Sequence, residues 1–384
     1  MINSLKSTLS RNITNASGWK TDRKIIVIES DDWGSIRMPN LKVKRSYESI
    51  GYNLNKNPYC KFDTLANSED LEVLFGTLSK FKDKEGRNLV MTLNTVMGNP
   101  SFNKILDSGF NDYFYEPFID TLNQYYPNDN VFKTWNQGIK EGLIKPQYHG
   151  REHVNVPLWL IELKNNNKPL VDAFNLSFWG IPEETYRPLN LNIQASYDSS
   201  KKEHLEFYKN SISEGLELFE KIFGFKSSTF IANNYIWSSE LNKLLDKKGV
   251  IGLQGMKYQK LPLSIEYKRS KKGVYTGKKN NFGQVHLVRN CIFEPSLFKT
   301  NFDNIGKCIE QIEQAFFFNK PAIITSHRLN YIGEISKKNR AGNIRDLKSL
   351  LESIQKKWPN VEFLSSDELI DYIKNKSALN RFRE

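Results

Sequence analysis

The sequence contains little cysteine and no long hydrophobic run. Its three cysteines, Cys60, Cys291 and Cys308, are too few and too widely spaced for a disulfide framework or a thiolate metal site. The apolar runs are short, as at 25–28, and none of them could cross a bilayer. The first ten residues lack the apolar core of a signal peptide, so we expect a cytoplasmic protein without a membrane span.

Sequence signals for nucleotide and nucleic-acid binding are also missing. No glycine-rich dinucleotide turn follows the first apolar run, where Asp31 and Asp32 stand instead. The 384 residues carry 55 Lys and Arg against 43 Asp and Glu, a net charge of +12, but the basic residues are spread along the whole chain. Without a zinc finger, a helix-turn-helix pattern or an aromatic RNA-binding motif, we do not expect a nucleic-acid partner. A basic surface would also suit an anionic polysaccharide.

The composition is that of a globular protein, with 39% hydrophobic and 26% charged residues. No internal repeat and no linker rich in Pro, Gly or Ser divides the chain. We therefore expect a loosely packed N-terminal arm over 1–22 and one domain over 23–384, with insertions around 100–130 and 258–283. The sequence does not indicate an oligomeric state.

Short β-branched runs alternate with longer amphipathic stretches along the chain. This alternation predicts an α/β fold with a parallel sheet. The expected strands span 24–30, 88–94, 145–149, 228–233, 249–254, 284–290, 321–327 and 361–366. The expected helices span 68–82, 131–142, 156–164, 202–222, 238–248, 303–317, 343–357 and 367–375.

Nearly every expected strand ends in polar residues. In a (β/α) barrel the carboxyl ends of the strands converge on one mouth, and the active site lies there. A doubly wound sheet would gather such residues at only one or two points. The strand ends therefore favour a distorted (β/α) barrel of seven or eight strands. The polar residues concerned include Asp31, Asp32, Asn94, His149, Asn233, Asn234, Arg289 and His327.

Two adjacent carboxylates follow the first expected strand. Buried at a strand end, Asp31 and Asp32 would repel each other and lose hydration, so they would need cationic or hydrogen-bonding partners. They could instead accept backbone N–H bonds at the start of a helix. Within a strand the two side chains would face opposite sides, but both can reach one cleft where the backbone turns.

Three of the five histidines stand at informative positions. His149 and His153 have the spacing that places two imidazoles on one side of a helical turn, which suits a shared metal but also occurs in surface pairs. His327 ends an apolar strand and is either a core histidine or a residue at a cleft mouth. One carboxylate and two imidazoles would make a hydrolytic metal site, with a second carboxylate as base and a separate histidine as acid.

At these residues the chain resembles the polysaccharide deacetylase superfamily, the NodB-homology carbohydrate esterases. It is most similar to a bacterial branch with an E-S-D-D-W-G opening, found here at 29–34. The H-[ST]-x-x-H motif corresponds to 149–153 and the L-x-H motif to 325–327. The resemblance covers 24–370. It implies a distorted (β/α) barrel of the glycoside hydrolase/deacetylase type and metal-dependent hydrolysis of an N- or O-acetyl group on a sugar.

The resemblance also implies roles for particular residues. Asp31 would be the general base and His327 the general acid, while Asp32, His149 and His153 would bind the metal. Zn²⁺ is the simplest ion for such a site, with Mn, Co and Ni as alternatives. The residues that we expect to bind the substrate are Trp33, Asn94, Arg151, Asn234, Tyr235, Arg289 and Arg328.

The chain departs from the family's motifs at several positions. Trp33 is inserted before Gly34, and Gly150 replaces the usual hydroxyl residue. The R-x-x-Y motif appears at 232–235 without its arginine, and no D-x-x-D-W motif is found near residue 254. The candidates to replace the lost arginine are Arg151, Arg289 and Arg328.

Three other functions are compatible with the sequence. A carbohydrate-binding protein on a decayed esterase scaffold would explain the missing motifs. A glycoside hydrolase needs carboxylates on opposite sides of the bond, so that Glu29, Glu152 or Glu294 would have to assist Asp31 and Asp32. Two histidines and one carboxylate also occur in Fe(II) oxygenases, but those favour a jelly roll of short strands.

Overall fold

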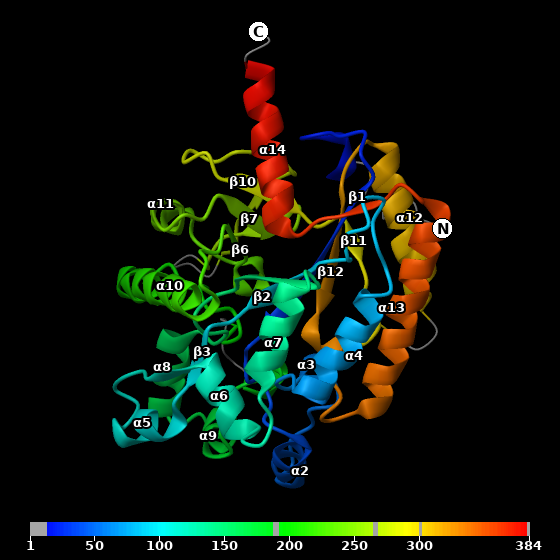
Figure 1. Cartoon of the computed structure of the whole chain (residues 1–384). Coiled ribbons are helices and arrows are strands. Elements are labelled where there is room, and N and C mark those ends of the chain that lie inside the picture. Colours follow the sequence, from blue (N-terminus) through cyan, green and yellow to red (C-terminus); the bar gives the residue numbers. More distant parts are fainter. Residues whose placement is uncertain (1–13, 187–191, 264–267, 299–301, 382–384) are drawn as a thin grey trace, which may run out of the picture.

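A parallel β-sheet forms the centre of the computed structural model, which describes residues 14–186, 192–263, 268–298 and 302–381 (Figure 1). Its strands are β1 (Ile25–Trp33), β2 (Met91–Thr95), β5 (Ile144–Tyr148), β6 (Thr229–Phe230), β7 (Gly252–Gly255), β10 (Val285–Val288), β11 (Cys291–Ile292), β12 (Ala322–His327) and β13 (Glu362–Phe363). Their order is β10-β7-β6-β5-β2-β1-β12-β11, and β13 pairs with the start of β1. In the described part of the chain β10 and β11 are not paired with each other, so the sheet is open there.

Helices surround the sheet (Figure 1). Seven of the described helices contribute to the largest hydrophobic cluster, together with outward-facing strand residues such as Ile26 and Leu93. These seven are α4 (Ser68–Leu78), α6 (Phe118–Tyr125), α7 (Val131–Lys140), α10 (Lys202–Phe223), α11 (Asn242–Lys247), α12 (Asn304–Phe317) and α13 (Lys337–Lys357). The other described α-helices are α2 (Leu41–Ser49), α3 (Pro58–Phe62), α5 (Phe102–Asp107), α8 (Val156–Lys164), α9 (Lys168–Asn175) and α14 (Ser366–Arg381).

Helix α14 packs inside the curled sheet. Side chains alternate along β1, so that Ile26 faces the outer cluster while Ile25 and Val27 face an inner one. Leu369 and Ile370 of α14 belong to this inner cluster. Helix α14 contacts β1 and also the neighbouring strands β7 and β10, which stand far from β1 in the strand order, so the sheet must curve around it. The sheet is therefore a distorted, open barrel with one end filled by α14.

The structure confirms the predicted α/β class and the distorted barrel. Each of the eight predicted strand regions contains a strand. The sequence analysis did not identify β11 or the two antiparallel hairpins, because runs of two or three residues show no periodicity. The hairpins are formed by β3 (Gly98–Pro100) with β4 (Tyr115–Pro117) and by β8 (Tyr258–Lys260) with β9 (Lys271–Gly273).

The segment before β1 contacts the body of the protein. Residues 1–13 of the predicted loose arm lie outside the described residues. In the described part, the backbone N–H of Trp19 donates to the carbonyl of Thr276 at 2.9 Å, and Lys320 Nζ donates to the carbonyl of Trp19 at 2.8 Å. Asn15 accepts a hydrogen bond of 2.9 Å from Asn290, next to the open edge. These contacts anchor the segment beside β10 and β11.

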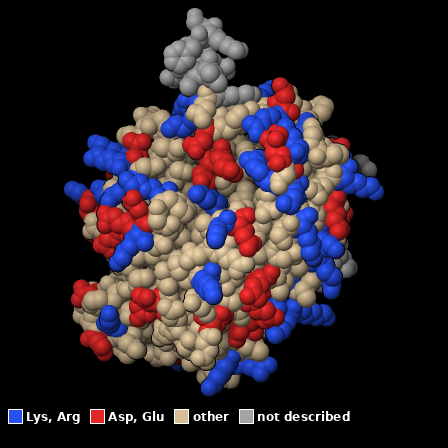
Figure 2. Space-filling view, viewed as in Figure 1, with Lys and Arg blue, Asp and Glu red and all other residues tan. Residues whose placement is uncertain are grey.

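Charged side chains of both signs are interspersed over the face shown in Figure 2. The net charge of +12 is therefore not gathered into one basic surface on this face. None of the described helices is long and apolar enough to cross a membrane.

Candidate functional site

A cavity of about 360 Å³ lies at the carboxyl ends of the strands. Its lining includes Asp31 and Asp32 from β1, His149 and His153 from the segment after β5, and His327 from the end of β12. Parallel strands bring residues that are distant in the sequence to the same mouth. All five residues expected to carry the chemistry therefore face one cavity, which we call the catalytic cavity.

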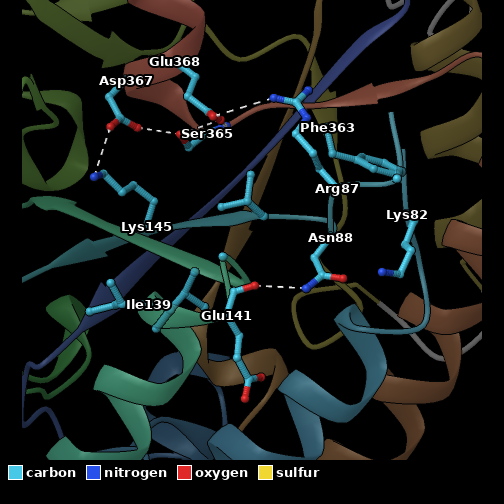
Figure 3. A pocket seen from close by; sticks show the side chains of 14 residues that line it. Lys82, Arg87, Asn88, Ile139, Glu141, Lys145, Phe363, Ser365, Asp367 and Glu368 are labelled. Carbon is cyan, nitrogen blue, oxygen red and sulfur yellow. Dashed lines mark hydrogen bonds and ion pairs between the residues drawn. The ribbon is translucent and has the colours of Figure 1, made fainter. Parts of the chain in front are cut away.

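A larger cavity, of about 510 Å³, opens at the other end of the sheet (Figure 3). It lies at the amino ends of β2 and β5, beside β13. Four of its charged side chains form pairs, since Lys145 lies 3.6 Å from Asp367 and Arg87 lies 4.0 Å from Glu368. No predicted site residue lies in its lining. We therefore place the functional site at the carboxyl ends of the strands.

A β-bulge in β1 directs two neighbouring carboxylates into the catalytic cavity. Ser30 pairs with Leu93 and Trp33 pairs with Thr95, so that β1 has one more residue than β2 between these two pairs. Asp32 adopts the left-handed conformation, with φ 73°, which is uncommon for residues other than glycine. The additional residue interrupts the alternation of side chains, so Asp31 and Asp32 reach the same cavity.

Asp32, His149 and His153 form a cluster that could hold a divalent cation. Asp32 Oδ1 lies 3.4 Å from His149 Nε2 and 3.0 Å from His153 Nε2, and all three side chains are buried. No other three His, Cys, Asp or Glu residues among those described offer ligand atoms so close together. His149 Nδ1 donates to the carbonyl of Ile231 at 2.9 Å, so its Nε2 carries the lone pair that could bind a metal; Asn233 Nδ2 lies 3.3 Å from this nitrogen.

The charges in the cluster suit a metal. Burial raises the pKa of Asp32, but His153 and Arg37 outweigh this effect and hold it well below its usual value. Arg37 Nη2 lies 3.3 Å from Asp32 Oδ2, the oxygen that faces away from the histidine contacts. Burial lowers the pKa of His153 to about 4, so the ring is neutral at pH 7. A carboxylate and two imidazoles are the donor set of hydrolytic zinc centres, so these residues fit such an ion.

Arg289 holds the other carboxylate of the bulge. Its Nη2 lies 2.6 Å from Asp31 Oδ1 and its Nη1 lies 2.7 Å from Oδ2, a bidentate pair. Asn94 Nδ2 donates to Asp31 Oδ1 at 2.8 Å. Burial raises the pKa of Asp31, but Arg289 more than offsets this and the net shift is downward. Of the three arginines considered as replacements for the missing motif arginine, the structure brings Arg289 to Asp31.

A buried polar layer supports Arg289 from inside the barrel. Glu29 lies two residues before Asp31 on β1 and therefore faces the same side. Arg289 Nε donates to Glu29 Oε2 at 2.6 Å, and Ser366 Oγ donates to Glu29 Oε1 at 2.7 Å. The first residue of α14 is thus connected to Asp31 through two buried side chains.

His327 has a carboxylate partner of its own. Its Nδ1 lies 2.5 Å from Glu294 Oε1, and its Nε2 lies 3.8 Å from Asp31 Oδ2. The ring of Tyr59 packs against the imidazole at 5.2 Å between ring centres. Burial lowers the pKa of His327, but Glu294 outweighs burial and the net effect raises it to about 9. His327 is therefore protonated at neutral pH, whereas Asp31 is ionised.

Two of the residues expected to bind substrate line the catalytic cavity. Asn234 and Tyr235 do so, with φ of 54° and 61°. Asn94 and Arg289 lie behind Asp31 and are absent from the cavity lining. Both contact Asp31, and Arg289 Nη1 also donates to the Tyr235 hydroxyl at 3.2 Å.

The expectation that Trp33 binds substrate needs correction. Its side chain is 1% exposed and lies in the outer hydrophobic cluster. The ring packs edge-on against Trp135, and Nε1 donates to Ser30 Oγ at 2.9 Å. The bulge explains this position, because Trp33 follows the extra residue and faces the helices outside the sheet.

Arg151 and Arg328 are also absent from the lining of the catalytic cavity. Arg151 Nη1 lies 2.6 Å from Glu214, and Arg151 also pairs with its neighbour Glu152. Arg328 is fully buried and lies 2.9 Å from Asp63. Both guanidinium groups neutralise buried or half-buried carboxylates and therefore stabilise the structure around the site.

Several residues of the catalytic cavity were not identified from the sequence. No expected strand end or motif marks them. Arg37 follows the bulge and donates to Gln194 at 2.5 Å as well as contacting Asp32. Glu294 lies outside the lining but contacts His327; the sequence suggests it only as a glycosidase carboxylate, because nothing in the sequence pairs it with His327. The other residues of this kind in the lining are Asn57, Tyr59, Glu183, Glu184, Asn192 and Gln194.

No protein-family model and no curated protein matches the sequence. Among solved structures, the chain is similar to two proteins described as polysaccharide deacetylases. The first, from Mycobacterium smegmatis, is 10% identical over 94% of both chains with a TM-score of 0.44. The second, from Pseudomonas aeruginosa PAO1, is 9% identical over 91% of both chains with a TM-score of 0.46.

The chain is similar as well to Puue allantoinase, with 10% identity over 92% of this chain and 91% of that chain and a TM-score of 0.47. At such identities few side chains are shared. The chemistry of the site therefore follows from its own residues.

Proposed function

We propose that the protein is a metal-dependent hydrolase that removes an acetyl group from a sugar or a polysaccharide precursor. The proposal is carried by one observation, the convergence of a buried Asp–His–His cluster, an ionised carboxylate and a protonated histidine on one cavity. Acyl hydrolysis at a metal centre needs these three components. The three motifs shared with the polysaccharide deacetylases favour an acetylated sugar as substrate.

Asp32, His149 and His153 would hold the ion, for which Zn²⁺ is the simplest choice. A divalent ion bound there would polarise the acyl oxygen and lower the pKa of a water molecule toward about 7. The hydrogen bond from His149 to Ile231 fixes the ring so that Nε2 faces Asp32 without reorientation.

Asp31 and His327 would move the protons. Asp31 is kept ionised and oriented by Arg289, so it would accept the proton of the attacking water. His327 is kept protonated by Glu294, so it would donate a proton to the leaving nitrogen or oxygen. Each transfer is worth roughly 10²–10⁴-fold in rate. Two neighbouring groups with opposite protonation states at one pH are the pattern expected of a base and an acid.

The alternative of a glycoside hydrolase lacks a suitable second carboxylate. Glu29 lies beneath Arg289, Glu152 accepts from Arg151 and Ser211, and Glu294 holds His327. None of the three lines the catalytic cavity. The alternative of a decayed scaffold rested on the missing motif arginine and the missing D-x-x-D-W motif. Arg289 contacts Asp31 and supplies a guanidinium there, which weakens the first of these two grounds.

Metal content tests the ligand set directly. We expect the intact protein, loaded with Zn²⁺ and dialysed, to retain one ion by plasma mass spectrometry, and His153→Ala to retain almost none. The reason is that the two remaining ligands, Asp32 and His149, cannot hold the ion without a third. His204→Ala is the matched control, because His204 lies on α10 and bonds to Ser199. Equal metal content in His153→Ala and the unchanged protein would contradict the site.

Acetate release from N-acetylchitotetraose tests the activity. We expect release by the Zn²⁺-loaded protein and a loss of roughly 10²–10⁴-fold in Asp31→Asn, with the metal content unchanged. Metal binding without acetate release from this or other acetylated glycans would contradict the enzyme assignment while leaving the metal site intact.

A further inference from the structure

A buried arginine contacts the carboxylate of the candidate metal site. Arg37 lies in the connection after β1 and lines the catalytic cavity, and its side chain is 3% exposed. Its Nη2 lies 3.3 Å from Asp32 Oδ2, whereas Oδ1 of the same carboxylate lies near His149 and His153. The two oxygens of Asp32 therefore have different partners, and Oδ1 is the one directed toward the histidines.

A second carboxylate and a second arginine continue this arrangement. Arg37 Nε lies 3.3 Å from Asp63 Oδ2, and Arg328 donates to the two oxygens of Asp63 at 3.0 Å and 2.9 Å. The side chains of Asp63 and Arg328 are fully buried. Carboxylates and guanidinium groups thus alternate in a buried row, which we call the charge row and which consists of Asp32, Arg37, Asp63 and Arg328.

Aromatic rings and a glycine hold Arg37 in place. Its Cζ lies 4.9 Å from the ring centre of Tyr59 and 5.5 Å from that of Trp179. A Cβ atom at Gly180 would lie 2.1 Å from Arg37 Cγ, so a larger residue there would displace the arginine. The indole of Trp179 also stacks on His153, with 5.6 Å between ring centres. The same ring therefore positions the arginine and one candidate metal ligand.

A positive charge beside a ligand carboxylate opposes the binding of a cation. The guanidinium offsets part of the negative charge of Asp32 and repels a second positive charge nearby, and burial strengthens both effects. The same contact compensates Asp32 when no cation is bound, so that the buried carboxylate keeps a partner. Arg37 therefore stabilises the metal-free site more than the metal-bound site.

We propose that Arg37 is a positioning residue that holds Asp32 through Oδ2, leaves Oδ1 for the ion and weakens the binding of that ion. The metal site itself rests on the proposed function, whereas the effect of Arg37 rests on the charge row. An ion whose carboxylate ligand is shared with a guanidinium keeps more of its charge for polarising an acyl oxygen. Arg37 thus lowers the affinity for the metal and increases the polarisation of the substrate.

The dissociation constant of Zn²⁺, measured by competition with a chromophoric chelator, tests this inference without an activity assay. We expect Arg37→Gln, which keeps an amide donor but removes the charge, to bind Zn²⁺ about tenfold more tightly than the unchanged protein. Arg37→Lys keeps the charge and should bind Zn²⁺ within about threefold of the unchanged protein. Asp63→Asn removes the negative charge behind Arg37 and should bind Zn²⁺ about tenfold more weakly.

The matched control is Arg340→Gln, because Arg340 is a buried arginine that pairs with Glu69 and Asp70 outside the lining of the catalytic cavity. We expect this control to bind Zn²⁺ as the unchanged protein does. A purely structural role of Arg37 predicts weaker binding in Arg37→Gln and Asp63→Asn alike, because both changes disturb the same row. Weaker or unchanged binding in Arg37→Gln would overturn the proposal.

Urea denaturation measures the same effect on the two states of the protein. We expect Arg37→Gln to lower the free energy of unfolding more in the metal-free protein than in the Zn²⁺-loaded protein, because the ion compensates Asp32 in the loaded state. Equal losses in both states would contradict the proposal. The expected shifts in affinity without any acetate release would support the role of Arg37 and count against the proposed hydrolysis alone.

Discussion

Asp31 and His327 owe their protonation states to one neighbour each. Burial alone would favour a neutral carboxyl and a neutral imidazole. A neutral carboxyl could not accept the proton of a water molecule, and a neutral imidazole could not donate a proton to a leaving group. Arg289 reverses the effect for Asp31, and Glu294 reverses it for His327. Neither of these two residues lines the catalytic cavity, so the acid–base chemistry depends on side chains outside it.

Removing the partner of His327 should change the pH dependence of activity. The acid works only while protonated, so activity should fall as the pH rises through the pKa of His327, which Glu294 raises to about 9. In Glu294→Gln burial acts without this opposition, and we expect the alkaline fall to begin at least one pH unit lower. The measurement is kcat/KM between pH 6 and 10, with Glu294→Asp as the conservative control. An alkaline fall at the same pH in both variants would contradict the role of Glu294.

At the scale of elements, the sequence predicts most of the strands and helices, but it does not show which helix packs on the inner side of the sheet. The apolar spacing of Leu369, Ile370 and Ile373 predicts a helix, and the same spacing occurs in helices that cover a sheet from outside. Only the tertiary structure shows that α14 lies inside the barrel, packed against β1, β7 and β10. The strand predicted over 361–366 is shorter in the structure. It ends at Phe363, because α14 already begins at Ser366.

Gly252 of β7 allows α14 to approach the strand. A Cβ atom at this position would lie 2.7 Å from Ile370 Cγ1 and 2.8 Å from Thr229 Cγ2. We therefore expect Gly252→Ala to lower the free energy of unfolding by about 1–3 kcal/mol, measured by urea denaturation. Gly255→Ala is the matched control on the same strand, because a Cβ there meets no atom within 4 Å. Equal stability of the two variants would show that α14 does not press on β7.

The bulge is another element that sequence patterns could not define. The pair Asp31 and Asp32 indicated a turn after the strand, but β1 continues to Trp33 with one extra residue. The left-handed backbone of Asp32 and the outward position of Trp33 both follow from that residue. No periodicity in the sequence marks a bulge in the middle of a buried run.

At the scale of the whole molecule, the sequence predicted the residues of the site that carry motifs and missed those that act on them. The five residues with expected catalytic or ligand roles face one cavity. The sequence did not place Arg37 beside Asp32 or Glu294 beside His327, and it offered Arg289 only as one of three candidates to replace the missing motif arginine. Their partners lie at other strand ends, and a contact such as Arg289 to Asp31 joins residues 258 positions apart. Only the curved sheet of the folded chain defines such pairs.

Buried histidines link the stability of the metal-free molecule to pH. Burial lowers the pKa of His153 and of His286 to about 4, so the unfolded chain binds more protons below pH 6.5 and stability falls toward pH 4. His327 acts in the other direction, because its folded pKa of about 9 means that its contribution is lost as the pH rises from 6.5 through 9. We expect the free energy of unfolding to be highest near pH 6.5, with each histidine contributing up to about 3 kcal/mol.

Urea denaturation of the metal-free protein at pH 4.5, 6.5 and 9 measures this profile. The His153→Gln variant should lose less stability on the acid side, and Glu294→Gln should lose less on the alkaline side. A profile that is the same in all three proteins would show that these groups do not control it.

The contact between Ser366 and Glu29 joins residues 337 positions apart, and it has a consequence for synthesis on the ribosome. The first strand is synthesised well before helix α14, which covers its inner side. Until α14 has been made, Ile25, Val27 and Glu29 lack this cover. The nascent chain therefore exposes apolar surface to chaperones and to other chains over that interval. The inner side of the barrel is completed only when this late segment packs against the first strand.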